Sequence, residues 1–380
     1  MIIKMFKKFK SRKVGVCLEN GHEHKERPRF PMTPAEVVRQ FGDRLTHSNV
    51  KEMSSYRELW YLGKEIDSSN HHDISSNDNT QVSNNHLAYR YELLKRLGEG
   101  SYGTVYKCLD HKTNEMVAVK IIKKFKSYRQ EVEIMDYLRK KDRNGSYNIV
   151  LMKNNFFFRK QLCIVYDLLG PSLNQLKKHR RFSSANLQHI CKDILKCLRL
   201  LEKEKIIHGD LKPGNIVLGK NGIKVIDFGG SSFEKKKKFP GAVTYTYSSP
   251  EVILKNPCST ATDMWSLGCI LAELHIGQYI FSGADAEQIA LIMEVLGKPP
   301  ADFFKDKNTW NYFYDDKGQW RDFYDVNNVL IKPGSKNLQK ILGTGDLQFL
   351  DFIQRCLSWN PAKRLTPSEA MKHPWLQSKS

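Results

Sequence analysis

Polar residues that suit phosphoryl transfer lie close together in the sequence HGDLKPGN, at positions 208–215. A carboxylate such as Asp210 positions a hydroxyl group and accepts its proton, and an ammonium such as Lys212 neutralises a phosphate. The amide oxygen of Asn215 suits a metal ion. Twelve residues beyond Asn215, Asp227 follows an apolar, strand-like run and offers a carboxylate for Mg²⁺. We therefore predict Asp210 and Lys212 as catalytic residues, and Asn215 and Asp227 as metal ligands.

A glycine-rich segment, GEGSYGTV at positions 98–105, lies between two runs that alternate like strands. Glycines at the tip of a hairpin are often only a turn. A dinucleotide site would need a helix directly after the third glycine, whereas Val105, Tyr106 and Lys107 continue a strand. The pattern therefore favours a flap that folds over phosphates.

Lys120 ends the apolar run VAVK. A lysine inside such a strand requires an anionic partner, because an unpaired buried ammonium is costly. Glu131 is the expected partner and Glu133 the alternative. On a helix Glu131 shares a face with apolar residues, whereas Glu133 falls on the opposite face.

These segments, followed by DFG at 227–229 and SPE at 249–251, occur in the order of the protein-kinase signature set. From Tyr89 to Leu376 the chain resembles the dual-specificity tyrosine-regulated kinases (DYRK) of the CMGC group, which includes cyclin-dependent and MAP kinases. The resemblance rests on HLAYRYELLKRLGEGSYG, DMWSLGCILAEL, an insert near 297–345 and LSWNPAKRLTPSEAMKHPWL. Residues 32–66 resemble the amino-terminal accessory segment of the class II branch.

The resemblance implies a protein serine/threonine kinase that uses ATP and Mg²⁺ and acts on protein substrates, with tyrosine phosphorylation left open. Tyr166 corresponds to the gatekeeper, and the hinge follows it. Thr244 corresponds to a residue that contacts the catalytic aspartate, Glu251 to the partner of Arg364, and Asp263 to a brace for the catalytic loop. The implied ATP-binding residues are Leu97, Gly98, Glu99, Gly100, Ser101, Tyr102, Gly103, Val105, Ala118, Lys120, Glu131, Asp167, Leu169 and Val217.

The activation segment departs from the family pattern. The family's Tyr-x-Tyr is Phe239-Pro240-Gly241 here, so Gly241 stands where the family has its regulatory tyrosine. Tyr245 and Ser248 replace the two arginines that grip the tyrosine phosphate, and Gly214 replaces a glutamate that helps to select basic substrates. The tyrosine that carries the regulatory phosphate in the family and the two arginines that bind this phosphate are thus both missing.

An α+β, bilobal fold is needed to position these residues. We expect a small β-rich N-lobe with its hinge at 89–170, and a larger, mostly helical C-lobe at 171–377. Before them we expect a basic disordered tail at 1–30, an accessory segment at 31–67 and a flexible linker at 68–86. In the accessory segment a helix is predicted from Pro34, and a second helix in SYRELWYLGKEI. Helices of the C-lobe are predicted at 185–204, 260–276, 285–296, 347–357 and 367–376.

Composition sets the remaining limits. The 380 residues are 40% hydrophobic, which excludes a wholly disordered chain, and the net charge of +20 favours anionic partners. No uncharged apolar run reaches 18 residues, so no membrane span is expected. Scattered cysteines favour a reduced intracellular protein, cytoplasmic or nuclear, and we expect a monomer. A pseudokinase scaffold and a kinase-shaped nucleic-acid binder are the alternatives.

Overall fold

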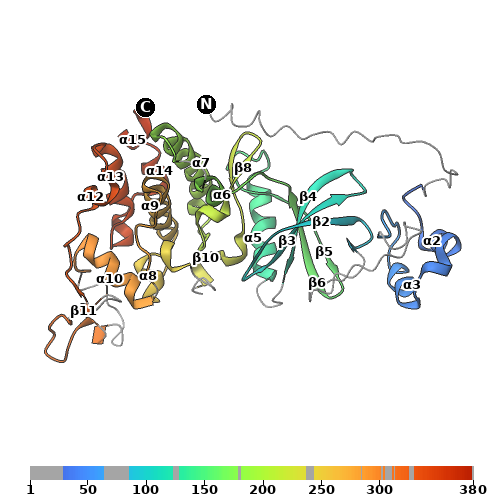
Figure 1. Ribbon diagram of the computed structural model, residues 1–380, viewed down its shortest axis with the longest axis horizontal. Helices are drawn as coiled ribbons and strands as arrows, with labels where there is room; N and C mark the ends of the chain where they lie inside the picture. The colour runs from blue at the N-terminus through green and yellow to red at the C-terminus, as the bar shows by residue number, and fades with distance from the viewer. Residues whose placement is uncertain are drawn as a thin grey trace. The chain divides into compact units, whose positions relative to one another are not determined.

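The computed structural model describes residues 29–63, 85–122, 128–178, 181–236, 244–283, 285–300, 303, 310–311, 313–324 and 329–378 (Figure 1). They form two compact units. The β-rich unit contains the described residues up to Tyr128, and then Met152–Leu168. The helical unit contains Arg129–Leu151 and the described residues from Leu169 onward. The predicted α+β class is confirmed.

The β-rich unit is built on one antiparallel sheet of six strands in the order β1-β2-β3-β4-β6-β5. The glycine-tipped hairpin predicted around positions 98–105 and the strand predicted to carry Lys120 are both present. The strands are β1 (His86–Leu87), β2 (Tyr91–Gly100), β3 (Gly103–Asp110), β4 (Glu115–Ile122), β5 (Met152–Phe158) and β6 (Gln161–Asp167).

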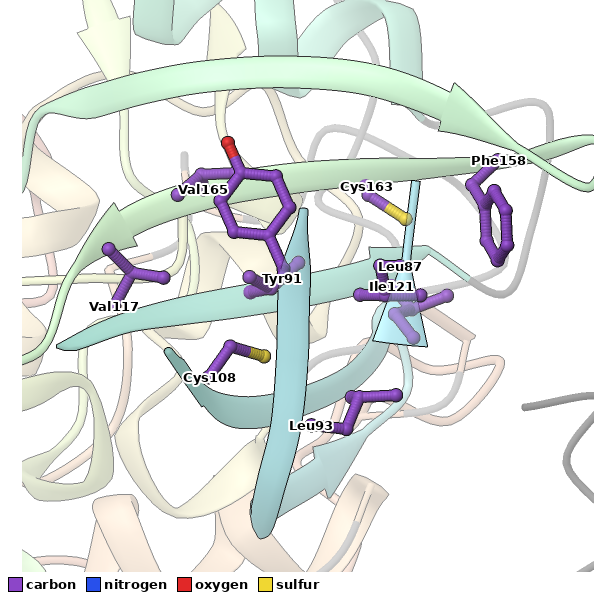
Figure 2. Packing of buried hydrophobic residues seen from close by; sticks show 10 residues of the cluster. Leu87, Tyr91, Leu93, Cys108, Val117, Ile121, Phe158, Cys163 and Val165 are labelled. Atoms are coloured by element: carbon purple, nitrogen blue, oxygen red, sulfur yellow. The ribbon is translucent and has the colours of Figure 1, made fainter. Parts of the chain in front are cut away.

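Alternation along these strands creates the core of the sheet. Tyr91 and Leu93 are buried, whereas Leu94, on the opposite face of β2, is 41% exposed. Side chains from five further positions on the sheet pack around Tyr91, as Figure 2 shows. These are Cys108, Val117, Ile121, Cys163 and Val165. The cluster fixes the register of the strands that carry Lys120 and the glycine-rich turn.

The accessory segment contains two short helices, and only the first was predicted. Helix α2 (Pro34–Phe41) begins at a capping box in which Thr33 and Glu36 satisfy each other's backbone groups. Helix α3 (His47–Met53) begins at Thr46, whose hydroxyl accepts a hydrogen bond from the amide of Asn49.

The helix predicted in SYRELWYLGKEI is wrong for the part that the structure describes. The chain is non-helical from Tyr56 to Gly63. It pairs with Met32 through Leu59, and the amides of Trp60 and Tyr61 both donate to the carbonyl of Tyr89. Leu59 and Leu62 are fully buried in this non-helical segment, whose backbone is held by pairing with Met32 and Tyr89.

The accessory segment is attached to the sheet through Glu52 of α3. Its carboxylate accepts hydrogen bonds from the phenol of Tyr89, at 2.7 Å, and from the Nε and Nη2 of Arg159, at 3.0 and 3.1 Å. Beneath this site Tyr89 packs in a hydrophobic cluster with Val37 and Met53. The segment therefore shares a core with the sheet.

Three long helices form the centre of the helical unit: α7 (Ser184–Lys203), α9 (Ala261–Ile276) and α13 (Leu347–Cys356). Helix α9 contacts both others and is buried almost all round, because apolar residues cover its whole circumference. The other helices are α5 (Tyr128–Lys141), α6 (Leu173–Lys177), α8 (Pro250–Ile253), α10 (Asp285–Leu296), α12 (Leu338–Leu342), α14 (Pro367–Ala370) and α15 (Pro374–Gln377).

Four of the five helices predicted for this unit are confirmed. The fifth, at 367–376, is divided into α14 and α15. Pro374 cannot donate a backbone hydrogen bond inside a helix, so it begins a new one instead, with His373 as its cap.

Short two-stranded sheets complete the helical unit. Strands β8 (Ile216–Gly219) and β9 (Gly222–Val225) form a hairpin, and β7 (Ile206–Ile207) pairs with β10 (Ser232–Phe233). A third pair, β11 (Phe323–Tyr324) with β12 (Leu330–Ile331), lies in the insert. The loop between β7 and β8 carries the predicted catalytic residues.

Among the described residues, no helix is both long and apolar enough to cross a bilayer. The predicted basic tail lies outside the described residues except for its last two positions. The predicted linker at 68–86 lies outside them except for Asn85 and His86.

Candidate active site

The loop between β7 and β8 brings Asp210, Lys212 and Asn215 together. The Nζ of Lys212 lies 3.0 and 2.7 Å from the two carboxylate oxygens of Asp210. The amide nitrogen of Asn215 donates to the backbone carbonyl of Asp210, at 2.8 Å, and to its Oδ2, at 3.2 Å. Asp210 is 8% exposed, so a buried carboxylate is held by fixed donors beside a cation.

Thr244 joins this group from the activation segment. Its hydroxyl lies 2.9 Å from Oδ1 of Asp210 and 3.1 Å from the Nζ of Lys212. This confirms the predicted contact between Thr244 and the catalytic aspartate.

The backbone of the loop is held by Asp263 of α9. Its carboxylate accepts hydrogen bonds from the amides of His208, at 2.8 Å, and Gly209, at 3.0 Å, as predicted. Burial raises the pKa of Asp263, and the two amides oppose that rise. Gly209 has a φ of 77°, a left-handed conformation that glycine adopts without a steric penalty.

Asp227 follows β9 in a strained conformation. Its φ of 63° and ψ of 77° are left-handed, which is uncommon for a residue with a side chain and is often found at functional sites. The carboxylate accepts a hydrogen bond from the amide of Gly229. The next residue, Phe228, is buried and packs its ring edge-on against His208. Packing of Phe228 thus fixes the backbone that presents Asp227.

Asn215 and Asp227 fit a hard divalent cation. An amide oxygen and a carboxylate are the oxygen ligands that Mg²⁺ takes, usually with one or two carboxylates and substrate phosphates completing the shell. The amide nitrogen of Asn215 is already engaged by Asp210, which leaves the amide oxygen as the atom for a metal ion. Among the described residues there is no cluster of three His, Cys, Asp or Glu side chains suited to a metal ion.

The segment after Thr244 is anchored by a buried ion pair. Arg364 makes two hydrogen bonds of 2.6 Å to Glu251, and the side chains are 0% and 2% exposed. Burial tends to raise the pKa of Glu251, but the Arg364 guanidinium outweighs burial and holds that pKa below its usual value. The predicted ion pair between Glu251 and Arg364 is therefore confirmed as a buried structural element of the helical unit.

In the β-rich unit, the glycine-rich segment forms the tip of the β2–β3 hairpin. Gly100 pairs with Gly103 across a two-residue turn of Ser101 and Tyr102. A Cβ atom at Gly103 would lie 2.4 Å from the carbonyl oxygen of Ile121, whereas one at Gly98 or at Gly100 would meet nothing within 4 Å. Gly103 is therefore required by the pairing of β3 with β4. Gly98 and Gly100 are not required by packing, and they leave the tip of the hairpin without side chains at these two positions. Leu97 and Glu99 belong to the same strand end.

Lys120 lies at the centre of the sheet, with Val105 and Ile164 as its neighbours on β3 and β6. It is 5% exposed, and its Nζ lies 5.8 Å from the centroid of the Tyr102 ring. Ala118, two residues earlier, pairs with Tyr166. Lys120 is thus buried in the strand that also carries Ala118, another residue that the family resemblance implies for ATP binding.

Glu131 belongs to α5 in the helical unit and is 3% exposed. It shares a buried face with Ile134, Met135 and Leu138, whereas Glu133 is exposed. The predicted assignment of the two glutamates to opposite faces is confirmed. The pairing of Glu131 with Lys120 stays a prediction.

The remaining predicted ATP-binding residues lie where the two units join along the chain and on β8. Asp167 ends β6 and pairs with Lys153 at 3.0 Å. Beyond Leu169, the amide of Gly170 donates to the carbonyl of Leu218, and Val217 is buried in β8. Their contact with ATP stays a prediction.

Sequence reasoning missed Ser231. Its hydroxyl donates to the carbonyl of His208, at 3.0 Å, and its own carbonyl accepts from Gln130 of α5, at 2.6 Å. Ser231 therefore links the catalytic loop to the helix that carries Glu131. A serine two residues after DFG carries no motif that would have indicated this role.

Comparison with known proteins agrees with this geometry. The model of the protein kinase domain matches residues 91–376. The human dual specificity tyrosine-phosphorylation-regulated kinase 4 is 43% identical over 371 residues, covering 92% of this chain and 71% of the relative. Kinase 2 of the same series, from Drosophila melanogaster, is 43% identical over 91% of this chain and 51% of its own length.

Kinase 3 from Mus musculus is 38% identical over 91% of this chain and 66% of its own length. The bilobal kinase fold, the catalytic loop and these relatives lead to one assignment. The chain belongs to the protein kinases, and within them to the family of dual-specificity tyrosine-phosphorylation-regulated kinases.

Proposed function

We propose that the protein transfers the γ-phosphate of ATP to serine or threonine residues of protein substrates, with Mg²⁺ as the cofactor. The observation that carries this proposal is the cluster of Asp210, Lys212 and Thr244, in which a carboxylate and an ammonium already hold a hydroxyl group. That arrangement supports phosphoryl transfer, which depends on positioning and on charge stabilisation.

The site residues of the helical unit have separate roles in the proposed mechanism. Asp210 orients the substrate hydroxyl and accepts its proton. Lys212 is positioned to neutralise the phosphoryl group as it transfers. Asn215 and Asp227 would hold Mg²⁺, which supplies charge neutralisation for the phosphates when it is bound. Asp263 keeps the loop in the geometry that aims Asp210.

Lys120, from the β-rich unit, would bind the α- and β-phosphates, and Glu131 is its expected partner. Because Gly98 and Gly100 have no side chains, the backbone at the tip of the hairpin would be able to approach the phosphates closely. Val105, Ala118 and Val217 would enclose adenine.

We further propose that the enzyme works without a phosphotyrosine in its activation segment. Residues 239–241, including the Gly241 that replaces the family's tyrosine, lie outside the described residues. At the two positions where the family resemblance implies arginine, this chain has Tyr245 and Ser248. The Ser248 hydroxyl donates to the carbonyl of Thr244, and Tyr245 accepts a hydrogen bond at its carbonyl from Gln288. Neither side chain offers a cation for a phosphate.

Phosphotransfer to protein with radioactive ATP tests the proposal. We expect Asp210→Asn to lower turnover by about 10² to 10⁴-fold while nucleotide binding is retained, because Asp210 contacts the substrate hydroxyl and not ATP. Lys120→Arg should also lower turnover, because a planar guanidinium does not replace a compact ammonium. A wild-type protein that binds ATP but transfers no phosphate would instead support a pseudokinase scaffold.

A further inference from the structure

Glu273 of α9 is a buried carboxylate close to the catalytic loop. It is 1% exposed, and its Oε2 accepts a hydrogen bond of 2.6 Å from the phenol of Tyr247. Burial, together with the neighbouring Glu273, raises the pKa of Tyr247, so the phenol stays protonated and remains a donor. Tyr247 and Glu273 therefore form a fixed pair.

Tyr247 connects this carboxylate to the site of phosphoryl transfer. A small pocket beside Asp210 is lined by Tyr247, Thr244 and Ser248 among other residues. The backbone of Tyr247 is held there on both sides, since its amide donates to the carbonyl of Thr244 and its carbonyl accepts from the Ser266 hydroxyl. Glu273 thus lies one side chain away from a pocket that contains the predicted catalytic aspartate.

The carboxylate of Glu273 forms an ion pair with a lysine of the same chain. The Nζ of Lys177, the last residue of α6, pairs with Oε1 of Glu273. The same ammonium lies 4.9 Å from the centroid of the Tyr279 ring, and that ring packs edge-on against Tyr247. Lys177 is 18% exposed, so the ammonium is held by a carboxylate and an aromatic face at the edge of the protein surface.

We propose that Lys177 is a specificity-determining residue that prevents Glu273 from binding a basic side chain of the substrate. A buried carboxylate that lies one side chain from the pocket at Asp210 would otherwise attract a lysine or arginine of a bound peptide. Here Lys177 and Tyr247 take one oxygen each, so an incoming cation meets a neutralised group and a fixed positive charge. Substrates with neutral or acidic residues next to the acceptor are then preferred to basic ones. This inference rests on the proposed function, because it concerns peptides that reach the same site.

A purely structural role for Lys177 predicts something different. If the lysine only compensates the buried charge of Glu273, its removal lowers stability and leaves peptide selection unchanged. The deciding measurement is therefore the sequence preference of the enzyme, with thermal stability recorded for every variant.

The experiment compares Lys177→Met with wild type on a positional peptide library in which arginine, glutamate or alanine occupies each position around the acceptor. We expect the variant to gain a preference for arginine over alanine of about tenfold at one or more positions, the range that a charge-assisted contact supports. Lys177→Arg should keep the wild-type profile. Lys178→Met, which removes the same charge from an exposed neighbour, should keep it too.

Glu273→Gln in the Lys177→Met background completes the test. The amide oxygen still accepts from Tyr247, but the charge is gone, so the gained preference should disappear. An unchanged profile in Lys177→Met, or a strong arginine preference in wild type, would overturn the inference.

Fluorescence anisotropy of the same peptides separates this inference from the proposed function. If no variant transfers phosphate but Lys177→Met binds arginine peptides about tenfold more tightly than wild type, the proposed function fails and the inference stands. If phosphate is transferred and neither turnover nor binding changes its preference, the inference alone fails.

Discussion

Removal of Arg364 should show how much the stability of the helical unit depends on the buried ion pair between Arg364 and Glu251. In Arg364→Met the carboxylate of Glu251, which is 2% exposed in the wild-type protein, loses both hydrogen bonds of 2.6 Å, and the Thr262 hydroxyl at 3.0 Å remains as a donor. Breaking a buried pair by removing one partner costs about 3–5 kcal/mol. Against a total stability of about 5–15 kcal/mol, that is a large fraction.

The pH dependence gives the effect a distinct signature. In wild type the folded pKa of Glu251 lies below its unfolded value of 4.5, so the pair stabilises the fold above that pH and loses its contribution as the pH falls through the folded pKa. Without Arg364, burial raises the pKa of Glu251 above the unfolded value. Its destabilisation then appears as the pH rises through 4.5 and is largest above the raised pKa.

Urea unfolding at several pH values measures both curves. The difference between wild type and Arg364→Met should be largest near neutral pH and should shrink toward pH 4.5. Glu251→Gln in the same background removes the buried charge and serves as the matched control, which should recover part of the loss at neutral pH. A difference below about 1 kcal/mol, or one that does not change with pH, would refute this reasoning.

Three further predictions follow from contacts described above. Gly103→Ala should lower the melting temperature, because the new Cβ would lie 2.4 Å from the carbonyl oxygen of Ile121. The Cβ of Gly100→Ala would meet no atom within 4 Å, so this variant should change only the affinity for ATP. Equal melting temperatures of the two variants would contradict this prediction. Mass spectrometry of the recombinant protein should find no stoichiometric phosphate on Tyr245 or Tyr247. The prediction would be wrong if either tyrosine were phosphorylated and if removal of that phosphate by a phosphatase abolished activity. A double-mutant cycle of Glu52→Gln and Arg159→Met should give a coupling energy of about 1–3 kcal/mol in urea unfolding, and additive effects would show that the contact contributes nothing.

The sequence predicted those parts of the fold that depend on local pattern. The glycine-tipped hairpin and helix α9 are examples, because strand alternation and a long apolar run are visible in one stretch of chain. The extended segment around Leu59 was not predictable in this way. Its partners, Met32 and Tyr89, are distant in sequence, and tertiary pairing decided its conformation.

The same distinction applies to the site. Asp210, Lys212 and Asn215 were predicted because they lie within six residues of each other in a recognisable spacing. Lys177 and Glu273 are 96 positions apart, and neither belongs to a motif. Only folding brings them together, so no pattern in the sequence could indicate the pair.

The contacts between the accessory segment and the sheet decide where a truncated fragment of this chain should begin. The match to the kinase domain begins at residue 91, two positions after Tyr89. A fragment designed from that boundary would discard Tyr89, whose phenol and carbonyl are both engaged with the segment at 29–63. It would also leave Arg159 without the carboxylate of Glu52 on the surface of the sheet. A fragment that starts before Met32 keeps the segment with the sheet, and it is the better starting point for crystallisation and for inhibitor screening.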